Sequence, residues 1–135
     1  MLGFDPITPG QPTLLIADDD AVVRSMLSLT LERQFEIVGA ARDSDQAIAL
    51  AQAAQPDVAL IDVQMPGGGL RAIRGIAEVS PETVAVVLSA DEFEPMVRQL
   101  MIAGAMTYVR KGIAPAQLTE VLHRAIRARP ALIAA

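Results

Sequence analysis

Acidic residues directly follow two of the most apolar runs in the sequence. Asp18 and Asp19 come after residues 14–17, and Asp62 comes after residues 58–61. Carboxylates gathered within a few ångströms repel one another, and one of them must take up a proton unless a cation lies among them. Oxygen ligands without imidazole or thiolate partners favour Mg²⁺. The sequence therefore predicts a magnesium site where these two segments meet.

Two further apolar runs lead to a hydroxyl group and an ammonium group. Ser89 follows residues 83–88, and Lys111 lies just beyond residues 106–109. Lys111 is the only lysine among eleven basic residues, and a lysine binds a carboxylate or phosphoryl oxygen as a point charge. A carboxylate, Mg²⁺, a hydroxyl and an ammonium around one cavity are the groups that phosphoryl transfer requires. An aspartate nucleophile would form an aspartyl phosphate.

The elements that must position these groups alternate along the chain. Short apolar runs without helical period predict five strands, at residues 13–17, 36–40, 58–61, 83–88 and 106–109. The segments between them have the period of a helix. Alternating βα units with right-handed crossovers give a parallel sheet with helices on both faces, (βα)₅ in all. Ligands bind such sheets at the carboxyl ends of the strands, where all four polar groups are expected.

The helical segments carry apolar stripes and recognisable ends. In the first segment, the residues that fall on one side of a helix form a mainly apolar stripe of Val23, Met26, Leu27, Thr30 and Leu31. Asp20 is expected to cap that helix, and Asp43 with Gln46 to cap the second, which Pro56 ends.

The composition limits the class of protein. A chain of 135 residues with 52% apolar and 20% charged residues is expected to fold as one domain over residues 13–129. Prolines and glycines in residues 1–12 predict a flexible arm, and residues 130–135 a tail. The absence of cysteine and the single histidine exclude disulfides and imidazole-rich zinc sites. A net charge of −5 argues against direct nucleic-acid binding, and no apolar run predicts a membrane span, so a cytoplasmic protein is expected.

Several motifs in order carry a resemblance to a known family. The chain resembles the receiver domain of bacterial two-component response regulators through Asp18-Asp19, the segment 56–67 around Asp62, Ser89-Ala90, and residues 104–111 ending in Lys111. The similarity covers roughly residues 13–128. It implies a flavodoxin-like, doubly wound five-stranded sheet of order 2-1-3-4-5, and a regulatory phosphoacceptor rather than an enzyme. The loop at residues 67–69 is one residue shorter than is usual in the family, and Gly112 stands where many members have proline.

The resemblance also implies a set of metal ligands. Asp62 would accept a phosphoryl group from a phosphohistidine donor in a Mg²⁺-dependent reaction. Asp19 would bind Mg²⁺ directly and Asp18 mainly through a metal-bound water. Gln64 would offer its backbone carbonyl to the ion.

The resemblance implies that the hydroxyl and the ammonium group would bind the new phosphoryl group. Ser89 would hydrogen-bond one phosphoryl oxygen, and Lys111 would pair with another. In the family these contacts draw in the loop after the fourth strand, and an aromatic residue on the fifth strand rotates inward. Tyr108 occupies that position. The switch would then be an equilibrium between two packing arrangements of the domain, shifted by the contacts of the phosphoryl dianion.

Two other functions fit part of the pattern. A haloacid-dehalogenase-like phosphatase would use Asp18 as its nucleophile in the D-x-D-x-[TV] opening at residues 18–22, but it needs an acidic pair after the lysine and leaves Asp62 without a role. The second alternative is a scaffold protein of the same fold that works without phosphorylation.

The expected partners follow from the resemblance. The donor would be a sensor histidine kinase or a histidine phosphotransfer protein. The output would be a downstream effector protein, or an effector domain missing from this chain. The surface of the fourth helix, fifth strand and fifth helix is the expected contact for that partner or for a homodimer.

Overall fold

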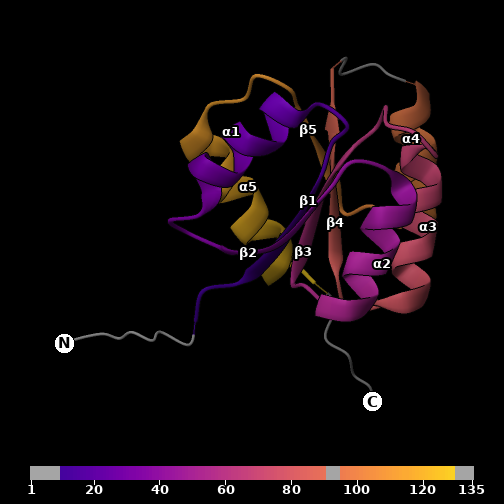
Figure 1. The fold of residues 1–135 in the computed structure, drawn as a ribbon, viewed down its shortest axis with the longest axis horizontal. Coiled ribbons are helices and arrows are strands. Elements are labelled where there is room, and N and C mark those ends of the chain that lie inside the picture. Colours follow the sequence, from indigo (N-terminus) through magenta and orange to yellow (C-terminus); the bar gives the residue numbers. More distant parts are fainter. Residues whose placement is uncertain (1–9, 91–94, 130–135) are drawn as a thin grey trace.

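The computed structural model describes residues 10–90 and 95–129, and within them five strands alternate with five helices (Figure 1). The elements are β1 (Thr13–Ala17), α1 (Ala21–Leu31), β2 (Glu36–Ala41), α2 (Ser44–Ala54), β3 (Val58–Asp62), α3 (Gly69–Val79), β4 (Val84–Ser89), α4 (Pro95–Ala103), β5 (Thr107–Arg110) and α5 (Pro115–Arg127). Most of the predicted arm and all of the predicted tail lie outside the described residues.

The strands form one parallel sheet in the order β2-β1-β3-β4-β5, which confirms the predicted fold. Two helices, α1 and α5, cover one face, and α2, α3 and α4 cover the other (Figure 1). Side chains of β1 alternate between the two layers. Leu14 and Ile16 belong to the core beneath α1 and α5, whereas Leu15 and Ala17 belong to the core beneath α2 and α3.

The predicted helix ends are confirmed. The Asp20 side chain accepts hydrogen bonds from the amides of Val22 and Val23, at 2.8 and 3.3 Å. Asp43 accepts one from the Gln46 amide at 2.8 Å. These contacts satisfy amide groups that have no partner inside the helix. Helix α1 therefore begins immediately after the acidic segment that leaves β1.

The first helix is less buried than its apolar stripe predicts. Of the five stripe residues only Leu31 is buried; Val23 and Leu27 are half-buried, and Met26 and Thr30 are exposed. The periodicity identified the apolar side of the helix correctly, but α5 covers only part of it.

The amino-terminal end of β3 is tied to both ends of the described domain. Asp57 Oδ2 accepts hydrogen bonds from the amide and the hydroxyl of Thr13, at 2.9 and 3.2 Å. Its other oxygen lies 3.8 Å from the Arg129 guanidinium, which also donates to the Glu82 carbonyl at 3.1 Å. The start of β1 and the residues after α5 therefore meet at the edge of the sheet opposite Asp62.

Candidate functional site

The register of the sheet brings the predicted site residues to one edge. Ala17 pairs with Ile61 and Asp62 pairs with Leu88, so that Asp18, Asp62 and Ser89 leave neighbouring strands at nearly the same level. Lys111 follows β5, and its amide donates to the Ser89 carbonyl at 2.8 Å. The hydrogen bond joins the ends of β4 and β5 beside the acidic segment.

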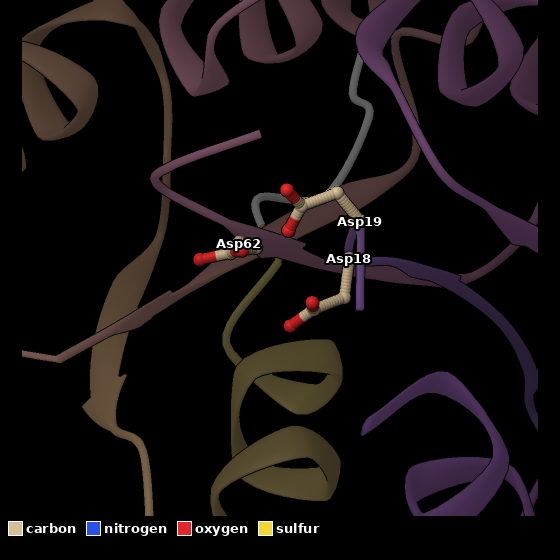
Figure 2. Close-up of side chains that lie close together, drawn as sticks. All are labelled: Asp18, Asp19 and Asp62. Atoms are coloured by element: carbon tan, nitrogen blue, oxygen red, sulfur yellow. The ribbon is translucent and has the colours of Figure 1, made fainter. Parts of the chain in front are cut away.

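Three carboxylates converge at this edge (Figure 2). Asp18, Asp19 and Asp62 each present an oxygen within 4.8 Å of the others. Asp18 and Asp62 are buried, and Asp19 is exposed. The clustering that the sequence predicted from strand ends is therefore found, with one side of the trio open to solvent.

Two of the buried carboxylate oxygens have no hydrogen-bond partner among the described residues, Asp18 Oδ2 and Asp62 Oδ2. The other oxygens of the pair are held in place, because Asp18 Oδ1 accepts from the Asp20 amide at 2.9 Å and Asp62 Oδ1 from the Gln64 amide at 3.2 Å. A buried anionic oxygen without a partner is costly unless a cation compensates it. This set of oxygens fits a hard divalent cation, and Mg²⁺ accepts two or three carboxylates together with water.

Lys111 supplies the positive charge of the site. Its Nζ lies 3.2 Å from Asp62 Oδ1 and 3.7 Å from Asp18 Oδ2. Burial disfavours the charged ammonium and is the largest single effect on its pKa. The negative charge of Asp62 and its hydrogen bond with Lys111, with smaller effects of Asp18 and Asp19, together outweigh burial and raise the pKa of Lys111. The lysine therefore stays protonated beside the carboxylates.

The carboxyl of Asp62 has a raised pKa. Burial is the largest cause, and the Gln64 amide opposes it; the negative charge of Asp18 raises the pKa further, while Lys111 lowers it. Two buried carboxylates with one ammonium carry an unbalanced negative charge. A divalent cation would correct that imbalance and favour ionised Asp62.

Ser89 and Tyr108 take different positions relative to this cluster. Ser89 is buried at the end of β4, next to the residue that pairs with Asp62. Tyr108 lies on β5 with 38% of its surface exposed. The loop after β4, whose movement the resemblance implied, includes residues 91–94, which lie outside the described residues.

One residue that supports the site escaped sequence reasoning. The Arg24 guanidinium donates to the Asp18 carbonyl at 2.8 Å, which ties the first turns of α1 back to the acidic segment. The signal was present, because Arg24 is the one charged residue in α1. Gln64 was expected to offer its backbone carbonyl to the metal ion, and the structure shows that its amide donates to Asp62 Oδ1 at 3.2 Å.

Comparison with known proteins identifies the family and matches the fold. Residues 14–123 match the family model for the response regulator receiver domain. The chain belongs to the response regulator receiver domain family. Receiver domains are regulatory phosphoacceptor domains rather than enzymes, and the phosphatase alternative is not favoured.

The relatives are full response regulators. The chain is 33% identical over 114 residues to the response regulator GacA of Pseudomonas aeruginosa, which covers 82% of this chain and 53% of the relative. It is 32% identical over 112 residues to the response regulator UvrY of Escherichia coli K12, covering 81% and 51%. The receiver domain thus spans about half the length of these relatives.

Solved structures include close matches in fold. The signal receiver domain of the response regulator NarL from Mycobacterium tuberculosis superimposes with a TM-score of 0.83 at 25% identity, over 90% of this chain and 100% of that one. The receiver domain of the response regulator AraT from Geobacillus stearothermophilus gives 0.76 at 28% identity, over 87% and 95%. No described helix of this receiver domain is long and apolar enough to cross a membrane.

Proposed function

We propose that this receiver domain accepts a phosphoryl group on Asp62 from a phosphohistidine donor in a Mg²⁺-dependent reaction. The observation that carries the proposal is the cluster of Asp18, Asp19 and Asp62 with Lys111, in which two buried carboxylate oxygens have no hydrogen-bond partner among the described residues. Membership of the receiver family supports it.

Phosphoryl transfer to Asp62 exchanges one bond to phosphorus for another. An oxygen of the ionised Asp62 carboxylate attacks phosphorus, and a new O–P bond forms while the P–N bond to the donor imidazole breaks. The electron pair of that bond stays on the imidazole nitrogen. The product is an acyl phosphate on Asp62.

The chain's own residues position and neutralise this reaction. The Gln64 amide and Lys111 contact Oδ1 of Asp62 and so fix the plane of the carboxylate. Lys111 would then pair with a phosphoryl oxygen, and the Ser89 hydroxyl would hydrogen-bond another. A bound Mg²⁺, held by Asp18, Asp19, Asp62 and the Gln64 carbonyl, would supply charge neutralisation for the transferring group.

The acceptor assignment is tested by labelling the purified domain with phosphoramidate, a small donor with a P–N bond, in the presence of Mg²⁺. Intact mass spectrometry should show the gain of one phosphoryl group in the wild type and in the surface control Asp45→Asn. Asp62→Asn should show none. Labelling that persists in Asp62→Asn would assign the chemistry to another carboxylate. A wild-type adduct that maps to Asp18, together with loss of labelling in Asp18→Asn, would assign it to Asp18. A wild type that takes up no phosphoryl group or beryllofluoride at any Mg²⁺ concentration would favour the scaffold function.

The output is proposed to run through α4, β5 and α5 toward a downstream effector. Tyr108 and Ile102 expose apolar surface there. Tyr108 is the single tyrosine of a chain without tryptophan, so that tyrosine fluorescence reports on this side chain alone. Beryllofluoride with Mg²⁺ should reduce quenching of that fluorescence by acrylamide as the ring turns inward, and Asp62→Asn should show no change. Equal quenching in the wild type before and after beryllofluoride would contradict a Tyr108 switch.

A further inference from the structure

Hydrogen bonds hold Asp18 at its amide, its side chain and its carbonyl. The amide donates to the Ala41 carbonyl at the end of β2, at 2.9 Å, and Oδ1 accepts from the Asp20 amide at 2.9 Å. The carbonyl accepts from the Arg24 guanidinium at 2.8 Å. The last of these contacts comes from a side chain inside α1, so that Arg24 fastens the helix to the backbone that leaves β1.

The Asp19 carboxylate has no comparable support. Its side chain is exposed, and none of the hydrogen bonds or ion pairs within residues 10–90 and 95–129 includes it. One of its oxygens nevertheless lies within 4.8 Å of oxygens of Asp18 and Asp62 (Figure 2). The position of this carboxylate therefore depends on the backbone that carries it.

The Arg24 hydrogen bond acts on that backbone. The Asp18 carbonyl belongs to the peptide bond that joins Asp18 to Asp19, and the atoms of a peptide unit lie close to one plane. A contact that fixes the carbonyl oxygen also fixes this plane, and with it the point from which the Asp19 side chain starts. A partly buried carbonyl that lost its donor would turn toward another partner.

Arg24 is itself well placed to hold the carbonyl. The side chain is half-buried, and its amide donates to the Asp20 carbonyl at 2.9 Å as part of the first helical turn. A hydrogen bond from a charged donor is also stronger than one from a neutral donor. The first turn of α1 and the acidic segment are therefore held together by both main chain and side chain.

The charge of Arg24 has the opposite effect on a bound cation. A guanidinium stays protonated in proteins, and here it lies beside the acidic segment, where it repels a divalent ion. Removal of the charge alone would strengthen Mg²⁺ binding, whereas loss of the hydrogen bond would weaken it. The direction of the change therefore distinguishes the two effects.

We propose that Arg24 is a positioning residue of the metal site, which holds the Asp18 carbonyl and thereby sets the direction in which Asp19 presents its carboxylate to the cation. The inference rests on the proposed function, because it concerns the Mg²⁺ that phosphoryl acceptance by Asp62 would require. It assigns to α1 a role in the site that the strand ends alone do not supply.

The first test uses the metal-free domain. Arg24→Met removes the donor and keeps most of the side-chain stem. Arg74→Met makes the same change of charge on α3, where Arg74 is exposed and takes part in no hydrogen bond or ion pair of the described residues. In chelator, NMR should show faster amide hydrogen exchange at Asp20 in Arg24→Met, because the acceptor of that amide belongs to Asp18. Arg74→Met should exchange as the wild type does.

The second test measures Mg²⁺ binding directly. The amide resonances of Val63 and Gln64 next to Asp62 are followed as Mg²⁺ is added. Arg24→Met should need roughly tenfold more Mg²⁺ for half-saturation, the loss typical when a group that orients a metal ligand is removed. Arg74→Met should match the wild type. Arg24→Lys should lie between the two, because a lysine keeps the charge and can donate one hydrogen bond to a carbonyl.

Labelling with phosphoramidate separates positioning from a purely structural role. At saturating Mg²⁺, Arg24→Met should approach the maximal rate of the wild type, while its half-saturating Mg²⁺ concentration stays raised. Urea unfolding in chelator measures the stability of each variant. A residue that only stabilised α1 would lower the free energy of unfolding and leave the Mg²⁺ requirement unchanged.

Three results would overturn the inference. If the wild type binds Mg²⁺ and Arg24→Met binds it equally well or more tightly, the inference fails and the proposed function stands. If the wild type binds no Mg²⁺, the proposed function fails and the inference fails with it. If Arg24→Lys binds Mg²⁺ as weakly as Arg24→Met, the contact with the Asp18 carbonyl is not the cause of the loss.

Discussion

Asp62 combines burial with a negative neighbour, and both disfavour its charged form. Its raised pKa means that the metal-free carboxyl holds its proton to a higher pH than the ordinary value of 3.8. Since only the ionised carboxylate attacks phosphorus, the metal-free protein keeps Asp62 in the unreactive, protonated form up to a higher pH than a free aspartate, and a bound divalent cation would favour the reactive form.

This expectation is testable by carboxyl ¹³C NMR of the metal-free domain in chelator. Asp62 should titrate above 3.8. Asp18→Asn should lower the pKa of Asp62, because it removes a negative neighbour, and Lys111→Met should raise it, because it removes the paired ammonium. An Asp62 resonance that titrates at or below 3.8, or that moves in the opposite directions in the two variants, would contradict the electrostatic account of the site.

The sequence predicted which residues meet at the site, but not their protonation. Asp18, Asp62, Ser89 and Lys111 follow strands, and the ends of parallel strands share one edge. The position of the Gln64 amide, and the absence of a hydrogen-bond partner for two buried carboxylate oxygens among the described residues, depend instead on the path of a loop over a few residues. No periodicity in the sequence encodes that path.

At the scale of elements, the turn between β3 and α3 contains two glycines that differ in why a side chain would be unfavourable: one through backbone conformation alone, the other also through lack of space. Gly67 and Gly68 have nearly the same φ, +87° and +88°, in the region that other residues rarely adopt. A Cβ on Gly67 would collide with the Ser44 hydroxyl at the start of α2, whereas a Cβ on Gly68 would meet nothing. A substitution at either glycine therefore strains the backbone, but only a substitution at Gly67 also creates a steric conflict.

Alanine substitutions should resolve the two contributions. Gly68→Ala should destabilise the domain by about 1–3 kcal/mol through backbone strain alone, because Gly68 has φ 88° and ψ 144°. Gly67→Ala should cost about 1–3 kcal/mol more, because Ser44 is buried and cannot move away freely. Urea unfolding measures both free energies. Equal losses in the two variants would show that α2 yields to the added methyl group.

Strands and helices differ in how well the sequence predicted them. The five strands appear within one residue of their predicted bounds, because buried parallel strands are short apolar runs with polar residues after them. The periodicity of α1 was also found, yet four of its five stripe residues are not buried. A period reports which side of a helix is apolar, and only the packing of α5 decides how much of that side is covered.

At the scale of the whole molecule, the excess negative charge of the site lowers the stability of the fold. A divalent cation that binds the folded carboxylate cluster, and not the unfolded chain, should stabilise the domain, by about 2.7 kcal/mol at one hundred times its dissociation constant. The melting temperature should therefore rise with Mg²⁺ concentration. Calorimetry should show a much smaller rise for Asp19→Ala, and the full rise for the surface control Asp45→Ala. A melting temperature that Mg²⁺ leaves unchanged in the wild type would argue against the cation site.

The hydrogen bonds and ion pair of Asp57 have a practical consequence. They hold Thr13 and Arg129 together at one pole of the molecule, and Asp62 lies at the other end of the same strand. A fluorophore, an affinity handle or a tether to a biosensor chip, joined through either of these two positions, would leave the reactive pole facing free solution. The domain is therefore suited to immobilised binding measurements in which the incoming protein must reach Asp62 unobstructed.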